Sequence, residues 1–303
     1  MKCPQCKKDK NLTKAGLRNS RQGIIQKYYC KKCKRYFSDK DQAYTQYPLK
    51  VILYTLQNFN KGYPVKKIKT LTGKKYRYSP PTRTIYSWIN KYKNTLTFIN
   101  LRKKYNVDPA TLTTTKKFYH KQIYPFTYHN LKLNLKTKNL PQLKRYINWI
   151  KRSLPNKIFL SGPRASQTDI KKDVKIIKRK TNATEITRLA LKTKEKNVSA
   201  HEIVEQFFLY NDKNTVCIEL PVFINPKETH LFKIDTPLTG HIDLIQIKNK
   251  ELYILDYKPN LRNPKNYVSQ LLAYKEAMHY RTHIPKDNII TSVFNEYQYY
   301  EFE

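Results

Sequence analysis

Two aspartates and a lysine stand in an otherwise apolar stretch towards the carboxyl end of the sequence. In GHIDLIQIKNKELYILDYKPN (residues 240–260), Asp243 lies within Ile-Asp-Leu-Ile, Asp256 follows Leu-Tyr-Ile-Leu, and Lys258 comes two residues later. Carboxylate oxygens are the ligands that Mg²⁺ and Mn²⁺ prefer in proteins. The stretch therefore offers two oxygen ligands for a hard metal ion, with an ammonium group beside them.

These residues need two strands to position them. The segments 241–247 and 251–257 predict an antiparallel hairpin with a two-residue turn, in which Asp243 faces Asp256. Opposed Cβ atoms lie roughly 4.5–5.5 Å apart, so two bare carboxylates there would repel each other, and a divalent cation between them removes the conflict. Asp256 and Lys258 are two residues apart and project from the same face. The alternative is that the acids face solvent on an edge hairpin, and a longer turn would shift the register by one residue.

Two flanking helices offer further polar side chains. The sequence SAHEIVEQFF predicts a helix that begins at Ser199 with the spacing of a capping box. His201 and Glu205 are four residues apart and share one face, so His201 is a candidate metal ligand and Glu205 a candidate for a role at or beside the ion. Downstream, YVSQLLAYKEAM predicts a helix with Gln270 and Tyr274 on one face. For this last pair, the alternative is ordinary helix packing.

Taken together, residues from about 198 to 303 resemble the PD-(D/E)XK nuclease superfamily, in the RecB-like branch that includes the CRISPR-associated exonucleases. That pattern consists of H-x-x-x-E on a helix, E-x-P on a strand, G-x-x-D, D-Y-K, and Q-x-x-x-Y on a helix. The chain carries these elements in the same order, as His201 and Glu205, ELP with Glu219, GHID with Asp243, DYK with Asp256 and Lys258, and Gln270 with Tyr274.

The resemblance implies a restriction-endonuclease-like α/β core with a mixed sheet and a role for each matched residue. Mg²⁺ or Mn²⁺ would be bound by His201, Asp243, Asp256 and the backbone carbonyl of Tyr257. The implied catalytic residues are Asp243, Asp256, Lys258, Glu205, Gln270 and Tyr274. Lys258 would orient the attacking water or stabilise the pentavalent phosphate, and Gln270 and Tyr274 would line the DNA side of the site. The CRISPR-associated members carry extra cysteines for an iron–sulfur cluster. Here Cys217 alone lies in the matching segment, so no iron–sulfur cluster is expected.

Four other cysteines stand near the amino terminus in two Cys-x-x-Cys pairs, CPQC and CKKC, separated by 23 residues. Each pair can point two thiolates at one ion, and two pairs complete a tetrahedral zinc site. The predicted Zn²⁺ ligands are Cys3, Cys6, Cys30 and Cys33. A closed site of four thiolates is structural rather than catalytic. The pattern resembles the zinc ribbons at the front of many transposases, and four unrelated cysteines are the alternative.

A helix-turn-helix pattern follows the cysteines. Residues 47–60 and 65–71 predict two helices, and PTRTIYSWINKYK (81–93) predicts a third that begins at a proline and buries Ile85, Trp88 and Ile89. This third helix would be the recognition helix. Its candidate DNA-binding residues are Arg83, Thr84, Tyr86, Ser87 and Asn90. The stretch resembles a transposase helix-turn-helix, and an ordinary three-helix bundle is the alternative.

Positive charge is concentrated in the first two thirds of the chain. Residues 1–200 carry 49 Lys and Arg against 8 Asp and Glu, whereas residues 201–303 carry 11 against 14. This excess, interleaved with tyrosines, predicts contact with a polyanion, and DNA is the expected partner. A merely soluble, lysine-rich surface is the alternative. No apolar run reaches the ~18 residues of a membrane span, and the amino terminus has no apolar signal segment. We therefore expect a cytoplasmic protein without a membrane partner.

The sequence thus predicts a multidomain α+β protein. Its expected parts are a zinc ribbon (1–42), a helix-turn-helix DNA-binding domain (45–95), a basic and mostly helical region (96–198), and a PD-(D/E)XK nuclease domain (199–303). The expected function is that of a metal-dependent DNA endonuclease of a mobile element or defence system, and double-strand cutting with one site per chain would favour a homodimer. The alternatives are a DNA-binding transcriptional regulator with an inactive nuclease fold and an RNA-processing protein.

Overall fold

The computed structural model describes residues 2–20, 23–38, 47–77, 79–168, 173–195, 197–231 and 233–303. The chain divides into two compact units. The first consists of residues 1–56 and 65–88, and the second of residues 57–64 and 89–303. The predicted boundary between the ribbon and the first helix, near residues 42–45, lies outside the described residues.

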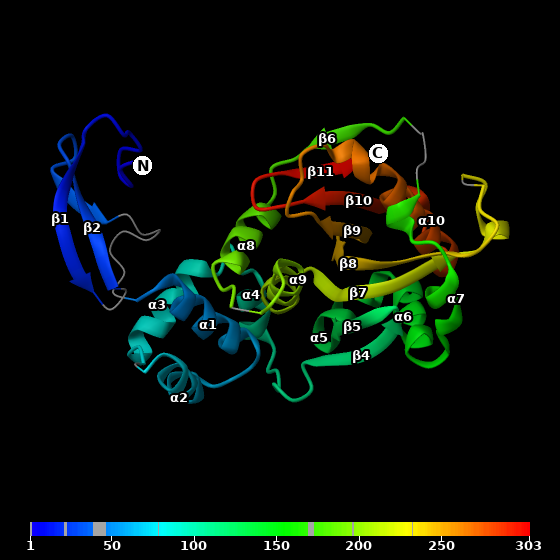
Figure 1. Ribbon diagram of the computed structural model, residues 1–303. Coiled ribbons are helices and arrows are strands. Elements are labelled where there is room, and N and C mark those ends of the chain that lie inside the picture. Colours follow the sequence, from blue (N-terminus) through cyan, green and yellow to red (C-terminus); the bar gives the residue numbers. More distant parts are fainter. Residues whose placement is uncertain are drawn as a thin grey trace. The chain divides into compact units, whose positions relative to one another are not determined.

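The first unit holds a small antiparallel sheet and three helices (Figure 1). The strands pair in the order β1-β2-β3, and their bounds are Leu12–Ser20, Gly23–Cys30 and Arg35–Ser38. The helices are α1 (Leu49–Asn60), α2 (Val65–Tyr76) and α3 (Thr82–Tyr92). Residues of α1 and α3 belong to both units, because the division falls within these two helices.

The three predicted helices are present, and α3 buries the residues that its pattern predicted. Ile85, Trp88 and Ile89 are buried, with 0–7% of their surface exposed. In α1, Ile52, Leu53 and Leu56 are fully buried. These faces follow from the 3.6-residue helical period. The assignment of the three helices as a DNA-binding helix-turn-helix stays a prediction.

The second unit is built on one mixed sheet of eight strands in the order β4-β5-β7-β8-β9-β10-β11-β6. Among the described strands of this sheet, β9 and β10 run parallel, and the other neighbouring pairs are antiparallel. The strands are β4 (Thr113–His120), β5 (Gln122–His129), β6 (Ile176–Lys178), β7 (Thr215–Ile224), β8 (Leu238–Lys248), β9 (Glu251–Tyr257), β10 (Ile289–Phe294) and β11 (Tyr299–Phe302).

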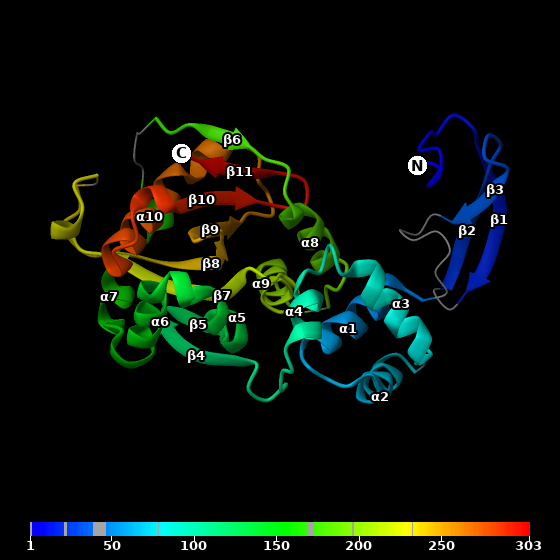
Figure 2. The same cartoon turned by 180° about the vertical axis from the view of Figure 1, so that it is seen from behind.

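Helices cover this sheet, and the central strands are buried along almost their whole length. The helix α10 packs along β7, β8, β9 and β10, and α9 packs against β7 and β8 (Figure 2). The helices of this unit are α4 (Phe98–Lys104), α5 (Asn130–Lys136), α6 (Pro141–Ser153), α7 (Asn156–Ser161), α8 (Asn182–Leu191), α9 (Ala200–Asn211) and α10 (Val268–Thr282). Short 3-10 turns lie at Thr137–Asn139, Ala165–Gln167, Pro226–Glu228, Pro264–Tyr267 and Lys286–Asn288. The fold class is thus α+β with a mixed sheet.

The hairpin β8–β9 has the predicted register. Lys248 pairs with Glu251 at one end and Leu244 with Leu255 at the other. The two turn residues, Asn249 and Lys250, have φ values of 49° and 70°. Both lie in the left-handed region, as a type I′ turn requires, and this turn matches the twist of the strands. In this register the next two residues along the strands are Asp243 and Asp256.

The prediction that residues 96–198 are mostly helical holds only in part. The predicted helix near residues 140–154 is present as α6, but residues 113–129 form the hairpin β4–β5 at one end of the large sheet. Aromatic residues recur at every second position on the inner face of this hairpin, and Phe118, Tyr124 and Phe126 among them are buried. This two-residue period is that of a strand. The region also supplies β6 at the opposite end of the sheet, so the predicted boundary at residue 198 falls within one compact unit.

Across the ranges that the structure describes, no helix is long and apolar enough to cross a membrane.

Candidate functional site

A cavity of about 640 Å³ opens into the second unit and brings together side chains from distant parts of its sequence. The helices α9 and α10 and the strands β7, β8 and β9 all contribute to its lining. Of the residues that the sequence indicated for metal binding or catalysis, the cavity is lined by His201, Glu205, Asp243, Asp256, Lys258, Gln270 and Tyr274. Glu219 lines it as well.

Asp243 contacts two of the predicted partners. One carboxylate oxygen, Oδ2, accepts a hydrogen bond of 2.7 Å from the backbone N–H of Tyr257. The same oxygen lies 3.3 Å from Nε2 of His201, on the first turn of α9. Burial lowers the pKa of His201, but the hydrogen bond and negative charge of Asp243 outweigh it, so the net pKa is raised. His201 thus holds a proton more readily than a free histidine.

Asp256 is 1% exposed and is held from two sides. Its Oδ2 atom forms an ion pair with Nζ of Lys258 at 2.6 Å. Its Oδ1 atom accepts a hydrogen bond of 3.1 Å from Nε2 of Gln270, which also donates to the hydroxyl of Tyr274 at 3.0 Å. Burial, followed by the charge of Asp243, raises the pKa of Asp256 to about 7. Gln270 and Tyr274, four residues apart on α10, thus act as a rigid support for this carboxylate.

Two further acids, Glu205 and Glu219, lie in the same cavity. Burial and the charges of neighbouring carboxylates raise the pKa of Glu205 well above its usual value and that of Glu219 to about 8. The buried Oε1 atom of Glu205 has no hydrogen-bond partner among the described residues. Glu219 has a φ of 53°, which is strained for a residue with a side chain. The negative charges of these clustered acids disfavour one another, so a bound cation would stabilise the site.

The close approach of α10 to β8 fixes the position of Tyr274 in the cavity. The Tyr274 hydroxyl donates to the backbone oxygen of His241 at 2.9 Å, and its ring lies directly over Gly240. A Cβ atom at Gly240 would lie 2.4 Å from the ring carbon Cε1. Glycine is therefore required here for the tyrosine to reach the site.

The remaining cavity wall was not indicated by the sequence. It consists of residues of the hairpin β4–β5, of Phe159 and of residues 164–166, and it includes His120, Tyr124 and Arg164. The alternation of aromatic residues in KFYHKQIYPF (117–126) is the sequence signal that could have revealed it, but the prediction of a basic helical region did not use that signal.

Comparison of the chain with protein-family models, with curated proteins and with solved structures found no match. The chemistry of the site therefore rests on the side chains themselves.

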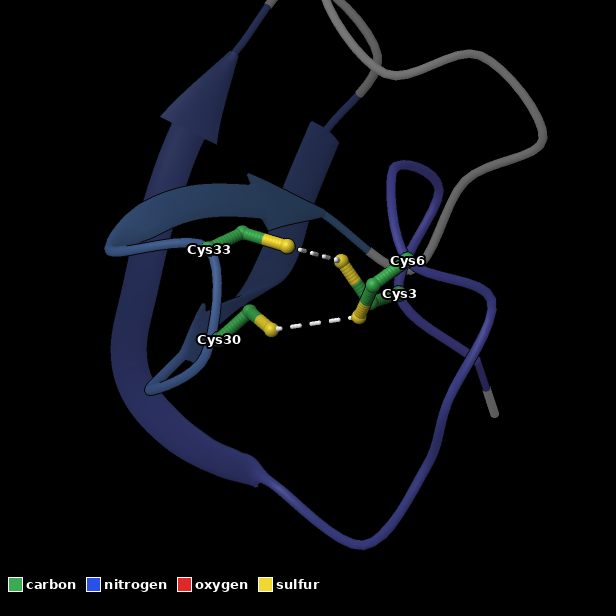
Figure 3. Close-up of side chains that lie close together, drawn as sticks. All are labelled: Cys3, Cys6, Cys30 and Cys33. Carbon is green, nitrogen blue, oxygen red and sulfur yellow. Dashed lines mark hydrogen bonds between the residues drawn. The ribbon is translucent and has the colours of Figure 1, made fainter.

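The four amino-terminal cysteines form a second candidate site, in the first unit. Their sulfur atoms all lie within 4.8 Å of one another. In Figure 3 the four side chains converge from two loops, with Cys3 opposite Cys33 at 3.9 Å and Cys6 opposite Cys30 at 3.7 Å. Backbone hydrogen bonding from Cys6 is the main cause that lowers the pKa of Cys3 to about 6, whereas burial and the other thiols raise that of Cys33 to about 12. This cluster could hold one metal ion.

The candidate recognition residues lie on the outward side of α3. Arg83, Tyr86, Ser87 and Asn90 are exposed, and Thr84 is half-buried. The helix therefore leaves their polar groups accessible to a partner, and their role in DNA binding stays a prediction.

Proposed function

We propose that this chain is a metal-dependent DNA endonuclease of the PD-(D/E)XK type, in the RecB-like branch. The observation that supports it most is the meeting of Asp243, Asp256 and Lys258 with His201 in one cavity. The acids come from two strands in the predicted register, the lysine directly follows the second strand, and the histidine comes from a separate helix. Nucleases of this type need such a set to bind a divalent cation beside a phosphodiester.

The donor set suits Mg²⁺ or Mn²⁺. Both ions take carboxylate and carbonyl oxygens as ligands. Burial, followed by the charge of Asp243, raises the pKa of Asp256, so a cation beside this carboxylate would be favourable. The unpaired Oε1 atom of Glu205 adds a buried acceptor in the same cavity. We propose that the ion is held by His201, Asp243, Asp256 and the backbone carbonyl of Tyr257. Once bound, such an ion lowers the pKa of its water and offsets charge on the phosphate.

Lys258 has a separate task. The charges of Asp256 and Asp243 outweigh burial and raise its pKa, so the ammonium stays protonated at neutral pH. A protonated amine cannot ligate a metal, but it donates hydrogen bonds. We assign Lys258 to a phosphate oxygen or to the attacking water. Gln270 keeps Asp256 oriented through its 3.1 Å hydrogen bond.

The other parts of the chain support binding rather than chemistry. The cysteine cluster would hold a structural Zn²⁺, because four thiolates leave no open position for a substrate. The exposed face of α3 and the excess of Lys and Arg in residues 1–200 would hold DNA. Cutting both strands with one site per chain would favour a homodimer on the substrate.

The test is incubation of the full chain with plasmid and with randomised duplexes of DNA or RNA, plus Mg²⁺ or Mn²⁺, followed by sequencing of the ends. DNA ends that depend on the metal and vanish with Asp256→Asn support the proposal. Asp287→Asn, which alters an exposed acid outside the cavity, is the matched control and should still cut. Binding without cutting would favour a regulator, and cutting of RNA alone would favour an RNA-processing enzyme.

A further inference from the structure

The large sheet opens at the cavity. The strands β5 and β7 pair only through Thr127 with Ile218 and Tyr128 with Cys217. Beyond Ile218 comes Glu219, with its positive φ, and from there the two strands no longer pair. The cavity is lined by residues 122–125 of β5 on one side and by Glu219 and residues of β8 on the other. It therefore lies where the sheet divides.

The two sides of this opening differ in charge. The side formed by β7, β8, β9 and α9 carries five acids against one cation, Lys258; the acids are Glu202, Glu205, Glu219, Asp243 and Asp256. The opposite side carries the cations Lys117, on β4, and Arg164, in the turn after α7. A phosphodiester strand is an anion that needs cations along its backbone and, under the function proposed above, a metal at the bond to be cut. The cavity supplies both kinds of contact on facing sides.

Arg164 is fixed by a stack of aromatic rings. Its guanidinium donates to the Tyr124 hydroxyl at 2.6 Å and to the backbone oxygen of His120 at 3.2 Å. Tyr124 stacks on His241 with ring centroids 3.6 Å apart and an interplanar angle of 5°. His241 in turn contacts His120 through ring nitrogens 2.8 Å apart.

Apolar side chains stand exposed at the tip of the same hairpin. Tyr119 and Ile123 are directly paired across β4 and β5, so their side chains share one face. They are 68% and 55% exposed. Lys117 lies two residues before Tyr119 on that face, and Lys121 is exposed in the turn. An aromatic ring and an aliphatic side chain among lysines form a surface on which unpaired bases stack while cations hold the phosphates.

We propose that a surface named here the hairpin wall binds an unpaired segment of a DNA strand and guides it to the carboxylates. The hairpin wall consists of Lys117, Tyr119, Ile123 and Arg164, with Tyr124 holding Arg164 in place. This inference rests on the proposed nuclease function. Arg164 and Lys117 contact phosphates, and Tyr119 with Ile123 stacks a base at the entrance. The cavity volume is within the roughly 300–1,000 Å³ of small-ligand sites, which suits one or two nucleotides rather than a duplex.

The test uses the full chain with Asp256→Asn, so that bound DNA stays intact. Single-stranded oligonucleotides with 5-iododeoxyuridine at successive positions are photo-crosslinked, and the attached peptide is identified by mass spectrometry. We expect a crosslink at Tyr119 that persists in Tyr119→Phe and disappears in Tyr119→Ala. Affinity for single-stranded DNA should fall by about 5- to 100-fold in Tyr119→Ala, as for the loss of one stacked base. The matched control Tyr297→Ala alters a tyrosine that is 75% exposed and outside the cavity, and should bind like the parent.

Charge is tested in the same way. Lys117→Ala and Arg164→Gln should weaken single-strand binding and reduce its dependence on salt, whereas Lys227→Ala, at an exposed lysine away from the cavity, should change neither. Circular dichroism shows whether the Arg164→Gln variant is folded. If it is not, the binding measurements with Lys117→Ala alone test the role of charge.

Two results would overturn the proposal that the hairpin wall binds DNA. One is the absence of any crosslink within residues 117–124 at every labelled position. The other is an equal loss of single-strand affinity in Tyr119→Ala and Tyr297→Ala. If the hairpin wall binds DNA but the parent chain cuts nothing with any metal, the nuclease proposal fails, whereas the proposal that the hairpin wall binds single-stranded DNA is kept. If the parent cuts and the wall variants cut and bind single strands as it does, the wall alone fails.

Discussion

The carboxylate of Asp243 accepts a 2.7 Å hydrogen bond from the backbone N–H of Tyr257, the residue after Asp256. This bond joins β8 to the end of β9 beyond Leu244 and Leu255, the last residues that pair in the hairpin. It brings two acids together at the point where His201 and Lys258 also arrive. Backbone geometry, rather than a charged partner alone, thus orients the first carboxylate.

We predict that Asp243→Asn and Asp256→Asn each abolish cleavage without abolishing DNA binding. Either change removes a negatively charged ligand of the proposed ion, which should lower the rate roughly 100-fold or more. Affinity should stay within a few-fold, because the exposed face of α3 and its basic surroundings are unchanged. A cleavage assay beside a gel-shift assay measures both. If Asp256→Asn cuts at the parent rate, the aspartates are structural.

Lys258→Met should separate catalysis from metal binding. The change keeps the length of the side chain but removes the ammonium that contacts Asp256 at 2.6 Å. We expect the rate to fall by about two orders of magnitude, and the affinity for Mn²⁺ to be kept or increased, because a competing cation is gone. Calorimetric titration with Mn²⁺ gives the affinity. Loss of the metal together with the activity would make Lys258 a structural residue of the site.

Asp256→Asn should stabilise the metal-free protein at neutral pH and not in acid. The pKa of Asp256 is raised from 3.8 to about 7 by burial and by Asp243. The folded state therefore favours the protonated acid, and its contribution to stability is present below pH ~4 and lost as the pH rises through 7. Asparagine carries no such dependence. The melting temperature of the variant should exceed that of the parent by roughly a few degrees at pH 8, and the gap should close at pH 4. A gap that widens in acid would contradict the assignment.

Gly240→Ala should displace Tyr274 and so weaken the hydrogen bonds that hold Asp256 through Gln270. The new Cβ would lie 2.4 Å from the Tyr274 ring, which must move and give up its hydrogen bonds to His241 and Gln270. Such overpacking costs about 1–3 kcal/mol, measurable by urea unfolding. In a Tyr274→Ala background the same glycine change should cost far less, since the ring is absent. Equal costs in both backgrounds would show that the contact does not matter.

Each chain should hold one tightly bound zinc. Cys33→Ser removes one of the four converging thiols, so it should release the metal and unfold the small sheet β1-β2-β3. The control is Cys217→Ala, in the sheet of the other unit, which should keep its zinc. Native mass spectrometry counts the metal. A folded, metal-free amino-terminal sheet in the parent chain would contradict the prediction.

The sequence by itself determined the features that depend on local chain geometry. The turn at Asn249 and Lys250 fixed the register that brings Asp243 beside Asp256, because a two-residue turn leaves one way to pair the strands. The helical period likewise fixed which side of α3 is buried. The two Cys-x-x-Cys pairs indicated a shared site because each pair already places its thiols together.

Only the tertiary structure decided what surrounds these residues. The hairpin β4–β5 joins the sheet through β7, and His120 meets His241 across 121 residues of sequence. No local period specifies such contacts, because any exposed strand edge offers the same backbone groups to a partner. The raised pKa of Asp256 depends in the same way on burial by elements far along the chain. Strand pairing between distant segments therefore built the second wall of the cavity, while local geometry supplied the acids that face it.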